Sequence, residues 1–278
     1  MVRTHLVMML FLATSFSLQA APLRETNHWV TVKGKIVWDE AKGEAPKQIA
    51  LVAGRDAQTA AMDTEFLSEE WVVNAKSGGI KNVVVWLAPE PSPLQLDDLK
   101  NKKLKVFPSF TPNDINPQLL KPANDSVVIE QHCCRFIPHV MAAQEGQKLI
   151  IKNTAPVPHN AKYFSLKNGE VNVLIRAKDE YALPKQLVAE KQAFKIDCAI
   201  HPWMAAFVRV FDHPYFAVSD ANGNFEIKDA PTLKGKLRMF VWHHDSGFSG
   251  GSKGFLGTTL EVKPGTMNLG AIKFEVPN

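Results

Sequence analysis

The stretch QAFKIDCAIHPWMAAFVRVFD, residues 192–212, decides the expected fold. Phe194 and Ile196 alternate with charged residues and share one face with Cys198, which is typical of a half-buried β-strand. A second apolar run, AAFVRVFD, begins at about Ala205. Two strands joined by so short a loop predict a sheet in which Cys198 stands at the end of one strand.

The loop between these strands carries three residues that bind soft metal ions. Cys198, His201 and Met204 follow one another at intervals of three, so one tight loop can present all three to a single ion. A fourth donor, His159, follows the apolar run GQKLIIKN and must come from a different strand. Two imidazoles and a thiolate with a weak axial thioether are the ligand set of an electron-transferring copper site.

Ordinary packing is the alternative for this pattern. Cys198 alone could be a buried core thiol, and His201 and Met204 could pack around Trp203. The two motifs together, in ligand order and at strand ends, favour the metal site.

Composition narrows the class of protein. The formal net charge is +4 with acids and bases interspersed, so nothing indicates a nucleic-acid partner. Residues 1–21 combine Arg3, an apolar run and small residues at Ala20 and Ala21, the pattern of a cleaved signal peptide. Later apolar runs are too short to span a bilayer, so we expect an exported, periplasmic protein without membrane insertion. Three cysteines in such a protein leave at least one thiol outside any disulfide.

The remaining sequence predicts mainly short strands. WVTVKGKIVW (29–38) alternates apolar and polar residues, whereas NVVVWLAP (82–89) is continuously apolar. Residues 63–71 predict a brief helix, and residues 89–125 predict a long surface connection. Asn222-Gly223 between apolar runs predicts a β-hairpin. Closely spaced strands with turn residues between them predict an all-β sandwich.

The order GQKLIIKN, PHN, CAIHPWM and strand resembles the copper domain of the cupredoxins: plastocyanins, pseudoazurins and especially amicyanins. The resemblance covers about residues 127–212. It implies a Greek-key β-sandwich with one type 1 copper ion, held by His159, Cys198, His201 and Met204.

The same resemblance implies roles for three neighbouring residues. Asn160 is expected to hydrogen-bond near the thiolate and to help close the site. The edge of His201, flanked by Pro202 and Trp203, is expected to form an apolar surface through which electrons enter and leave.

We expect four segments along the chain. They are the signal peptide (1–21), an N-terminal β segment with a connecting region (22–125), the copper domain (126–212) and a C-terminal β module (213–278). YFAVSDANGNFEI resembles the small carboxypeptidase-regulatory-like β modules. Residues 29–88 are compatible either with added strands of the copper sandwich or with a separate module.

Two further clusters contain metal-ligand residue types. In HCCRFIPH, a second metal or redox site could use His132, Cys133, Cys134 and His139, although adjacent cysteines on a strand point to opposite faces. A vicinal disulfide and simple burial are alternatives. In Trp242-His243-His244-Asp245 we interpret the histidines as a solvated strand end.

These observations favour an exported protein that carries single electrons between redox partner proteins and is not an enzyme. A copper-handling protein would use the same ligands but would exchange the ion readily. An adhesion or binding sandwich without electron transfer is the third hypothesis.

Overall fold

The computed structural model describes residues 28–276 except 53–55, 61–65, 104–105 and 133. The predicted signal peptide, residues 1–21, lies outside these residues. The described residues form four β-sheets that pack as two sandwiches, so the predicted all-β sandwich class is confirmed. Within the described residues, no helix is long and apolar enough to cross a membrane.

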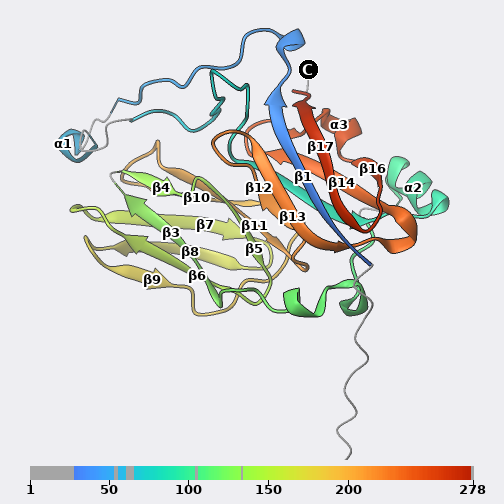
Figure 1. The fold of residues 1–278 in the computed structure, drawn as a ribbon. Helices are drawn as coiled ribbons and strands as arrows, with labels where there is room; N and C mark the ends of the chain where they lie inside the picture. The colour runs from blue at the N-terminus through green and yellow to red at the C-terminus, as the bar shows by residue number, and fades with distance from the viewer. Residues whose placement is uncertain (1–27, 53–55, 61–65, 104–105, 133, 277–278) are drawn as a thin grey trace, which may run out of the picture.

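The inner sandwich is formed by residues 126–211 (Figure 1). One sheet has the order β5-β11-β10-β7-β8 and the other β4-β3-β6-β9. The first sheet contains β5 (Val140–Gln144), β7 (His159–Ser165), β8 (Gly169–Ile175), β10 (Phe194–Asp197) and β11 (Ala205–Phe211). The second contains β3 (Ser126–His132), β4 (Arg135–Ile137), β6 (Lys148–Asn153) and β9 (Glu180–Ala182). A single apolar core, including Ile129, Ile151 and Ile196, fills the space between them.

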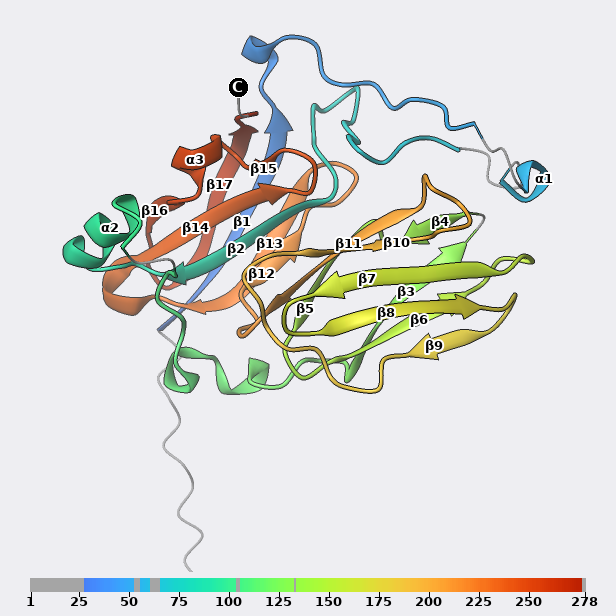
Figure 2. The ribbon, with the colours of Figure 1, turned by 180° about the vertical axis from the view of Figure 1, so that it is seen from behind.

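The outer sandwich lies beside the inner one in both ribbon views (Figures 1 and 2). Its sheets have the orders β13-β1-β17 and β12-β2-β14-β15, with β16 paired to β14. The first contains β1 (Trp29–Trp38), β13 (Asn224–Pro231) and β17 (Gly265–Phe274). The second contains β2 (Val83–Pro89), β12 (Phe216–Val218), β14 (Lys236–His243), β15 (Gly247–Phe248) and β16 (Thr258–Glu261).

The outer sandwich combines the two ends of the described chain. Strand β1 pairs antiparallel with β13 and parallel with β17, and β2 pairs with both β12 and β14. Strands β1 and β2 therefore join the C-terminal strands instead of extending the sheets of the inner sandwich. The boundaries of the four expected segments, including 126 and 212 for the copper domain, stay predictions.

Strand β2 is buried on both faces, which explains its continuous apolar sequence. Val83, Val85 and Leu87 face the core of the outer sandwich. Val84, Trp86 and Ala88 face the other way and pack with residues that include Val140 and Phe211 of the inner sandwich. The two sandwiches join in this contact layer, which we call the seam.

Two local predictions from sequence are wrong. Residues 66–71 of the predicted 63–71 helix are not helical, and Leu67 forms a β-bridge with Ala50. The Asn222-Gly223 turn does form, with Gly223 N–H donating to Asp220 O over 2.9 Å. The strands on either side of this turn lie in different sheets, however: β12 pairs with β2, and β13 pairs with β1. They therefore do not form a hairpin with each other.

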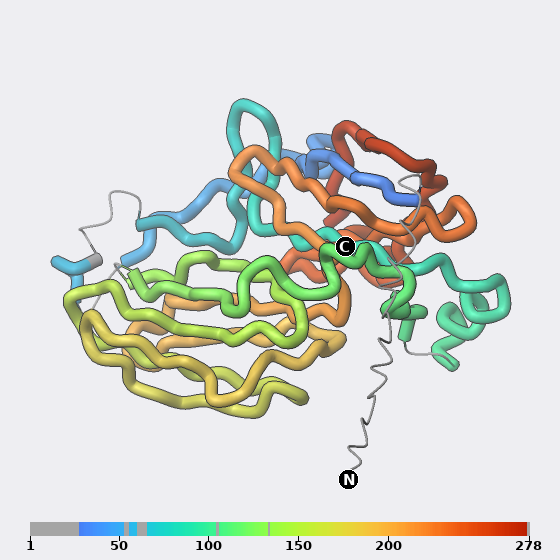
Figure 3. The backbone as a smooth tube through the Cα atoms, turned by 60° about the horizontal axis from the view of Figure 1, so that its bottom comes forward, coloured from blue at the N-terminus to red at the C-terminus, as the bar shows by residue number. Residues whose placement is uncertain are grey.

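The chain between β1 and β2 leaves the outer sandwich, reaches the far end of the inner one near β4, and returns (Figures 1 and 2). Figure 3 shows the same excursion from another side. It contains η2 (Glu40–Lys42) and α1 (Ala57–Ala60). The other short helices are α2 (Pro93–Lys100), η3 (Pro112–Asp114), η4 (Pro117–Leu119), η5 (Leu233–Gly235) and α3 (Gly251–Gly254).

Candidate metal centre

Two neighbouring strands bring the expected ligands to the same end of the inner sandwich. His159 is the first residue of β7, and Cys198 follows the last residue of β10. These strands pair antiparallel, with Asp197 opposite Lys162. In an antiparallel pair the start of one strand lies beside the end of the other, so the two side chains meet at one edge.

The loop after β10 is closed by its own backbone. Cys198 N–H donates to Met204 O over 3.3 Å, and Met204 N–H donates to His201 O over 2.9 Å. The side chains of all three residues are buried, with His201 completely so. The chain resumes as β11 at Ala205, as the sequence predicts.

Two pairs of donor atoms lie close together at this edge. The Nδ1 atoms of His159 and His201 are 3.0 Å apart, and Cys198 Sγ lies 3.7 Å from His201 Nδ1. Metal–nitrogen bonds of about 2.0–2.1 Å and metal–sulfur bonds of about 2.3 Å, as at zinc sites, place two ligands of one ion at such separations. The pairs His159–His201 and Cys198–His201 each fit two ligands of one metal ion, and Met204 is buried in the same core as Cys198.

The tautomer of His201 and the protonation state of His159 suit metal binding. His201 Nε2 is 3.0 Å from Asp56 Oδ2, a contact that holds the ring proton on Nε2 and leaves Nδ1 as a lone-pair donor. Burial, together with the nearby His201, lowers the pKa of His159 to about 4. His159 is therefore neutral near pH 7, as a metal ligand must be.

Asn160 connects the two halves of the centre. Its backbone N–H donates to Cys198 Sγ over 3.3 Å, and its side-chain Oδ1 accepts from Ala199 N over 3.1 Å. Its Nδ2 in turn donates to Asn172 Oδ1 over 2.8 Å. The hydrogen bond expected near the thiolate is thus present and is made by the backbone.

The structure adds Cys134, which sequence reasoning had placed in a different cluster. Its buried thiol and the imidazoles of His159 and His201 have ligand atoms within 4.8 Å of one another. Cys134 occupies the turn between β3 and β4, where its φ is 63°. Strand β3 runs parallel to β6, the strand that leads to His159, so both strands end at the same edge. That pairing is itself a contact between distant segments, so no local sequence signal located Cys134.

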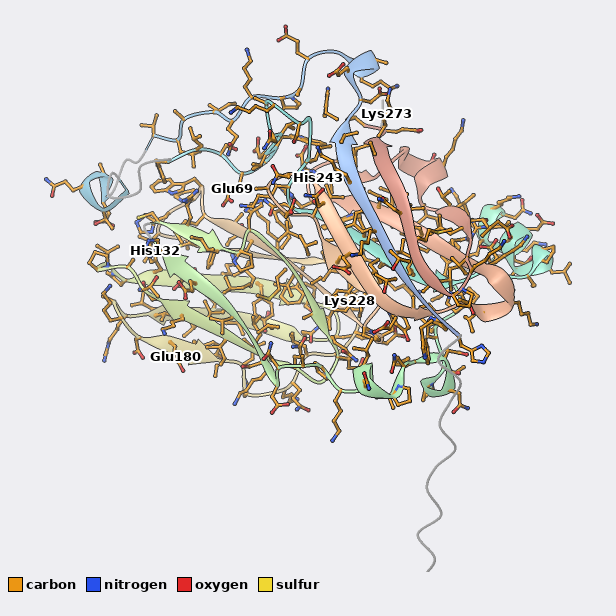
Figure 4. The ribbon with its side chains drawn as sticks, in the orientation of Figure 1. Glu69, His132, Glu180, Lys228, His243 and Lys273 are labelled. Atoms are coloured by element: carbon orange, nitrogen blue, oxygen red, sulfur yellow. The ribbon has the colours of Figure 1, made fainter. Side chains whose placement is uncertain are left out.

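The other members of the predicted second cluster have different surroundings. His132 is exposed and its Nδ1 lies 3.1 Å from Thr154 Oγ1, while Cys133 lies outside the described residues. His139 Nε2 lies 3.1 Å from His244 Nε2 in the seam. Strands β3 and β4 form a hairpin here, which directs successive side chains to different faces. Figure 4 shows His132 at the end of β3, well away from His243.

The expected electron-transfer edge of His201 is covered. His201 has no exposed surface, and Asp56 from the excursion occupies the position beyond Nε2. Trp203 is half-buried, with Phe66 against its ring and its Nε1 donating to Cys134 O over 3.0 Å. Of this predicted surface, only Pro202 is exposed.

No protein-family model matches this chain, and no curated protein matches it. Among solved structures, it is similar to variants of amicyanin. A Cu(I) form of a methionine-to-alanine variant is 18% identical, covering 33% of this chain and 87% of that chain, with a TM-score of 0.27. An oxidised methionine-to-leucine variant is 16% identical with the same coverages and a TM-score of 0.28. What the centre can bind follows from its own donor atoms.

Proposed function

We propose that the protein binds one copper ion with His159, Cys198, His201 and Met204 and carries single electrons between redox partner proteins outside the cytoplasm. Two short distances support this proposal most directly: 3.0 Å between the Nδ1 atoms of His159 and His201, and 3.7 Å between Cys198 Sγ and His201 Nδ1. Bound copper would supply one-electron chemistry between Cu(I) and Cu(II). The role is that of a carrier and not of an enzyme.

The protein's own contribution is to hold the ligands rigidly and to tune the sulfur. His159 is set by β7, Cys198 by β10, and the loop up to Met204 by two backbone hydrogen bonds. The N–H of Asn160 directed at Cys198 Sγ withdraws electron density from the sulfur, as hydrogen bonds around metal ligands generally do. Pro202 and the partly exposed Trp203 remain the candidate surface for electron exchange.

Cys134 favours a second candidate function, copper handling. A second thiol beside two imidazoles adds a soft donor, and thiolates favour Cu(I). Such a protein would hold Cu(I) for delivery instead of cycling between two oxidation states. The complete burial of His201 beneath Asp56 opposes rapid exchange of the ion and therefore favours the carrier.

Absorption and EPR spectra of the purified full chain after addition of one equivalent of Cu(II) test the proposal. We expect an intense thiolate-to-copper charge-transfer band in the visible range, lost in Cys198→Ser and kept in Cys134→Ser. Cys134→Ser is the matched control because it removes a second buried thiol and leaves Cys198 in place. A band that survives Cys198→Ser contradicts the ligand assignment. Colourless protein that binds Cu(I) through both thiols supports the handling function.

A further inference from the structure

Three histidine rings gather in the seam, outside the centre described above. His139 lies between β4 and β5, while His243 ends β14 and His244 follows it. The ring centroids of His139 and His244 are 4.5 Å apart, as are those of His243 and His244. Residues distant in sequence thus meet where the two sandwiches join. Figure 4 shows His243 at this place, with Glu69 in the same region.

The hydrogen bonds of His139 prepare one nitrogen as a ligand. Its Nδ1 lies 2.9 Å from Ala205 O, and a carbonyl oxygen can only accept, so Nδ1 carries the proton. The neutral ring therefore has its lone pair on Nε2. That lone pair faces His244 Nε2 at 3.1 Å. A backbone carbonyl that fixes the ring in this way is a common support for metal-binding histidines.

The other two rings have nitrogens without a protein partner. Among the described residues, no hydrogen bond satisfies the buried atoms His243 Nε2 and His244 Nδ1. His243 Nδ1 accepts from Asp245 N–H over 3.3 Å, and Trp71 stacks on the His243 ring at 3.9 Å. Neither of these two nitrogens belongs to the His139–His244 contact, in which the two Nε2 atoms face each other.

A cavity provides room for a bound ligand. It measures 380 Å³, and its lining includes His139, His244 and Glu69. Met204 and Trp203 line the same cavity. The cavity therefore has room for water or a carboxylate to complete the coordination of an ion bound between His139 and His244.

We propose that His139 and His244 bind a second metal ion, Cu(II) or Zn(II), through their Nε2 atoms. Two nitrogens 3.1 Å apart, each about 2.0–2.1 Å from one ion, subtend an angle of about 100° there, which suits neighbouring ligands of either metal. In the metal-free protein, His244 Nε2–H donates a hydrogen bond to His139 Nε2, and metal binding would displace this proton. The inference uses none of the four proposed copper ligands and stands independently of the electron-carrier function.

The test is a Cu(II) titration of the full chain, followed by EPR and by metal analysis after gel filtration. We expect two bound equivalents, the second with a dissociation constant below about 1 µM and with nitrogen hyperfine structure from two imidazoles. His139→Gln and His244→Gln should each lose this second equivalent, and the exposed His132→Gln should keep it.

Three outcomes overturn the inference: one bound equivalent in the wild-type protein, a second signal without two-nitrogen structure, or a second signal unchanged in His244→Gln. The wild-type measurement decides even if a variant fails to fold. A second equivalent without the thiolate band would remove the electron-carrier proposal and leave this site standing. The thiolate band with only one bound equivalent would support the electron-carrier proposal and remove the second site.

Discussion

At the scale of single residues, Asp56 and His201 show how a distant segment completes a site. They are separated by 145 positions in sequence, yet Asp56 Oδ2 accepts from His201 Nε2 over 3.0 Å. This contact fixes both the orientation of the ring and its tautomer. Partners of this kind typically change metal affinity 10- to 100-fold.

Asp56→Ala is therefore expected to weaken copper binding by roughly 10- to 100-fold, because the His201 ring loses the acceptor that orients it. Asp56→Asn keeps a side-chain oxygen that can accept and should restore most of the affinity. Competition with a chromophoric Cu(I) chelator measures both variants. Asp97→Ala, on the surface of α2, is the control. Equal affinities for Asp56→Ala and Asp97→Ala would contradict the positioning role.

At the level of elements, three backbone segments pack closely at the end of β1: β1 itself, the chain around Gly79 and the turn at Asn222-Gly223. Val37 forms a β-bridge with Gly79, and Ile36 N–H donates to Gly223 O over 2.8 Å. A Cβ atom on Gly79 would overlap the carbonyl of Asn222. Only glycine allows the turn after β12 to lie this close to the strand.

Gly79→Ala should lower the free energy of unfolding by about 3 kcal/mol, because the neighbouring backbone must move. The adjacent Gly78→Ala is the control that separates steric overlap from backbone strain. Gly78 has φ +64°, which strains an alanine, but it has open space around it. Gly78→Ala should cost about 1 kcal/mol. Urea titrations of both variants give the two values. A Gly79→Ala cost no greater than that of Gly78→Ala would mean that the close approach is unimportant.

At the scale of the whole molecule, burial keeps several histidines neutral. Desolvation is the largest cause in each case. The pKa is lowered to about 4 for His139, His159 and His213, to about 3 for His243 and to about 2 for His244. The unfolded chain takes up these protons below about pH 6.5, whereas the folded chain does so only at lower pH. Their contribution to stability is complete above pH 6.5 and is lost progressively as the pH falls.

The metal-free protein should therefore have a free energy of unfolding that declines as the pH drops from 6.5 toward 4. His213→Gln isolates one member away from both proposed metal sites and keeps an acceptor for Tyr215 N–H. It should reduce the slope in this range by up to about 1.4 kcal/mol per pH unit, the value for one proton. Denaturant titrations at several pH values give the slopes. An unchanged slope would show that His213 is protonated in the fold.

Local sequence patterns were enough to predict several strands and the loop that carries three of the proposed ligands. Alternation at residues 29–38 and 192–212 identified β1, β10 and β11, because a strand with one buried face imposes a period of two. The spacing of Cys198, His201 and Met204 needed only local geometry, since one loop carries all three. His159 was identified by residue type and by its place after an apolar strand.

The pairing of the strands and the surroundings of the proposed ligands became known from the tertiary structure. The turn at Asn222-Gly223 was visible in the sequence, but the separation of its flanking strands into different sheets was not. Asp56 above His201, Cys134 beside the imidazoles, and His139 facing His244 all depend on contacts between distant segments. Local periodicity records which face of an element is buried but not which partner buries it, so these contacts became visible only once the two sandwiches were packed together.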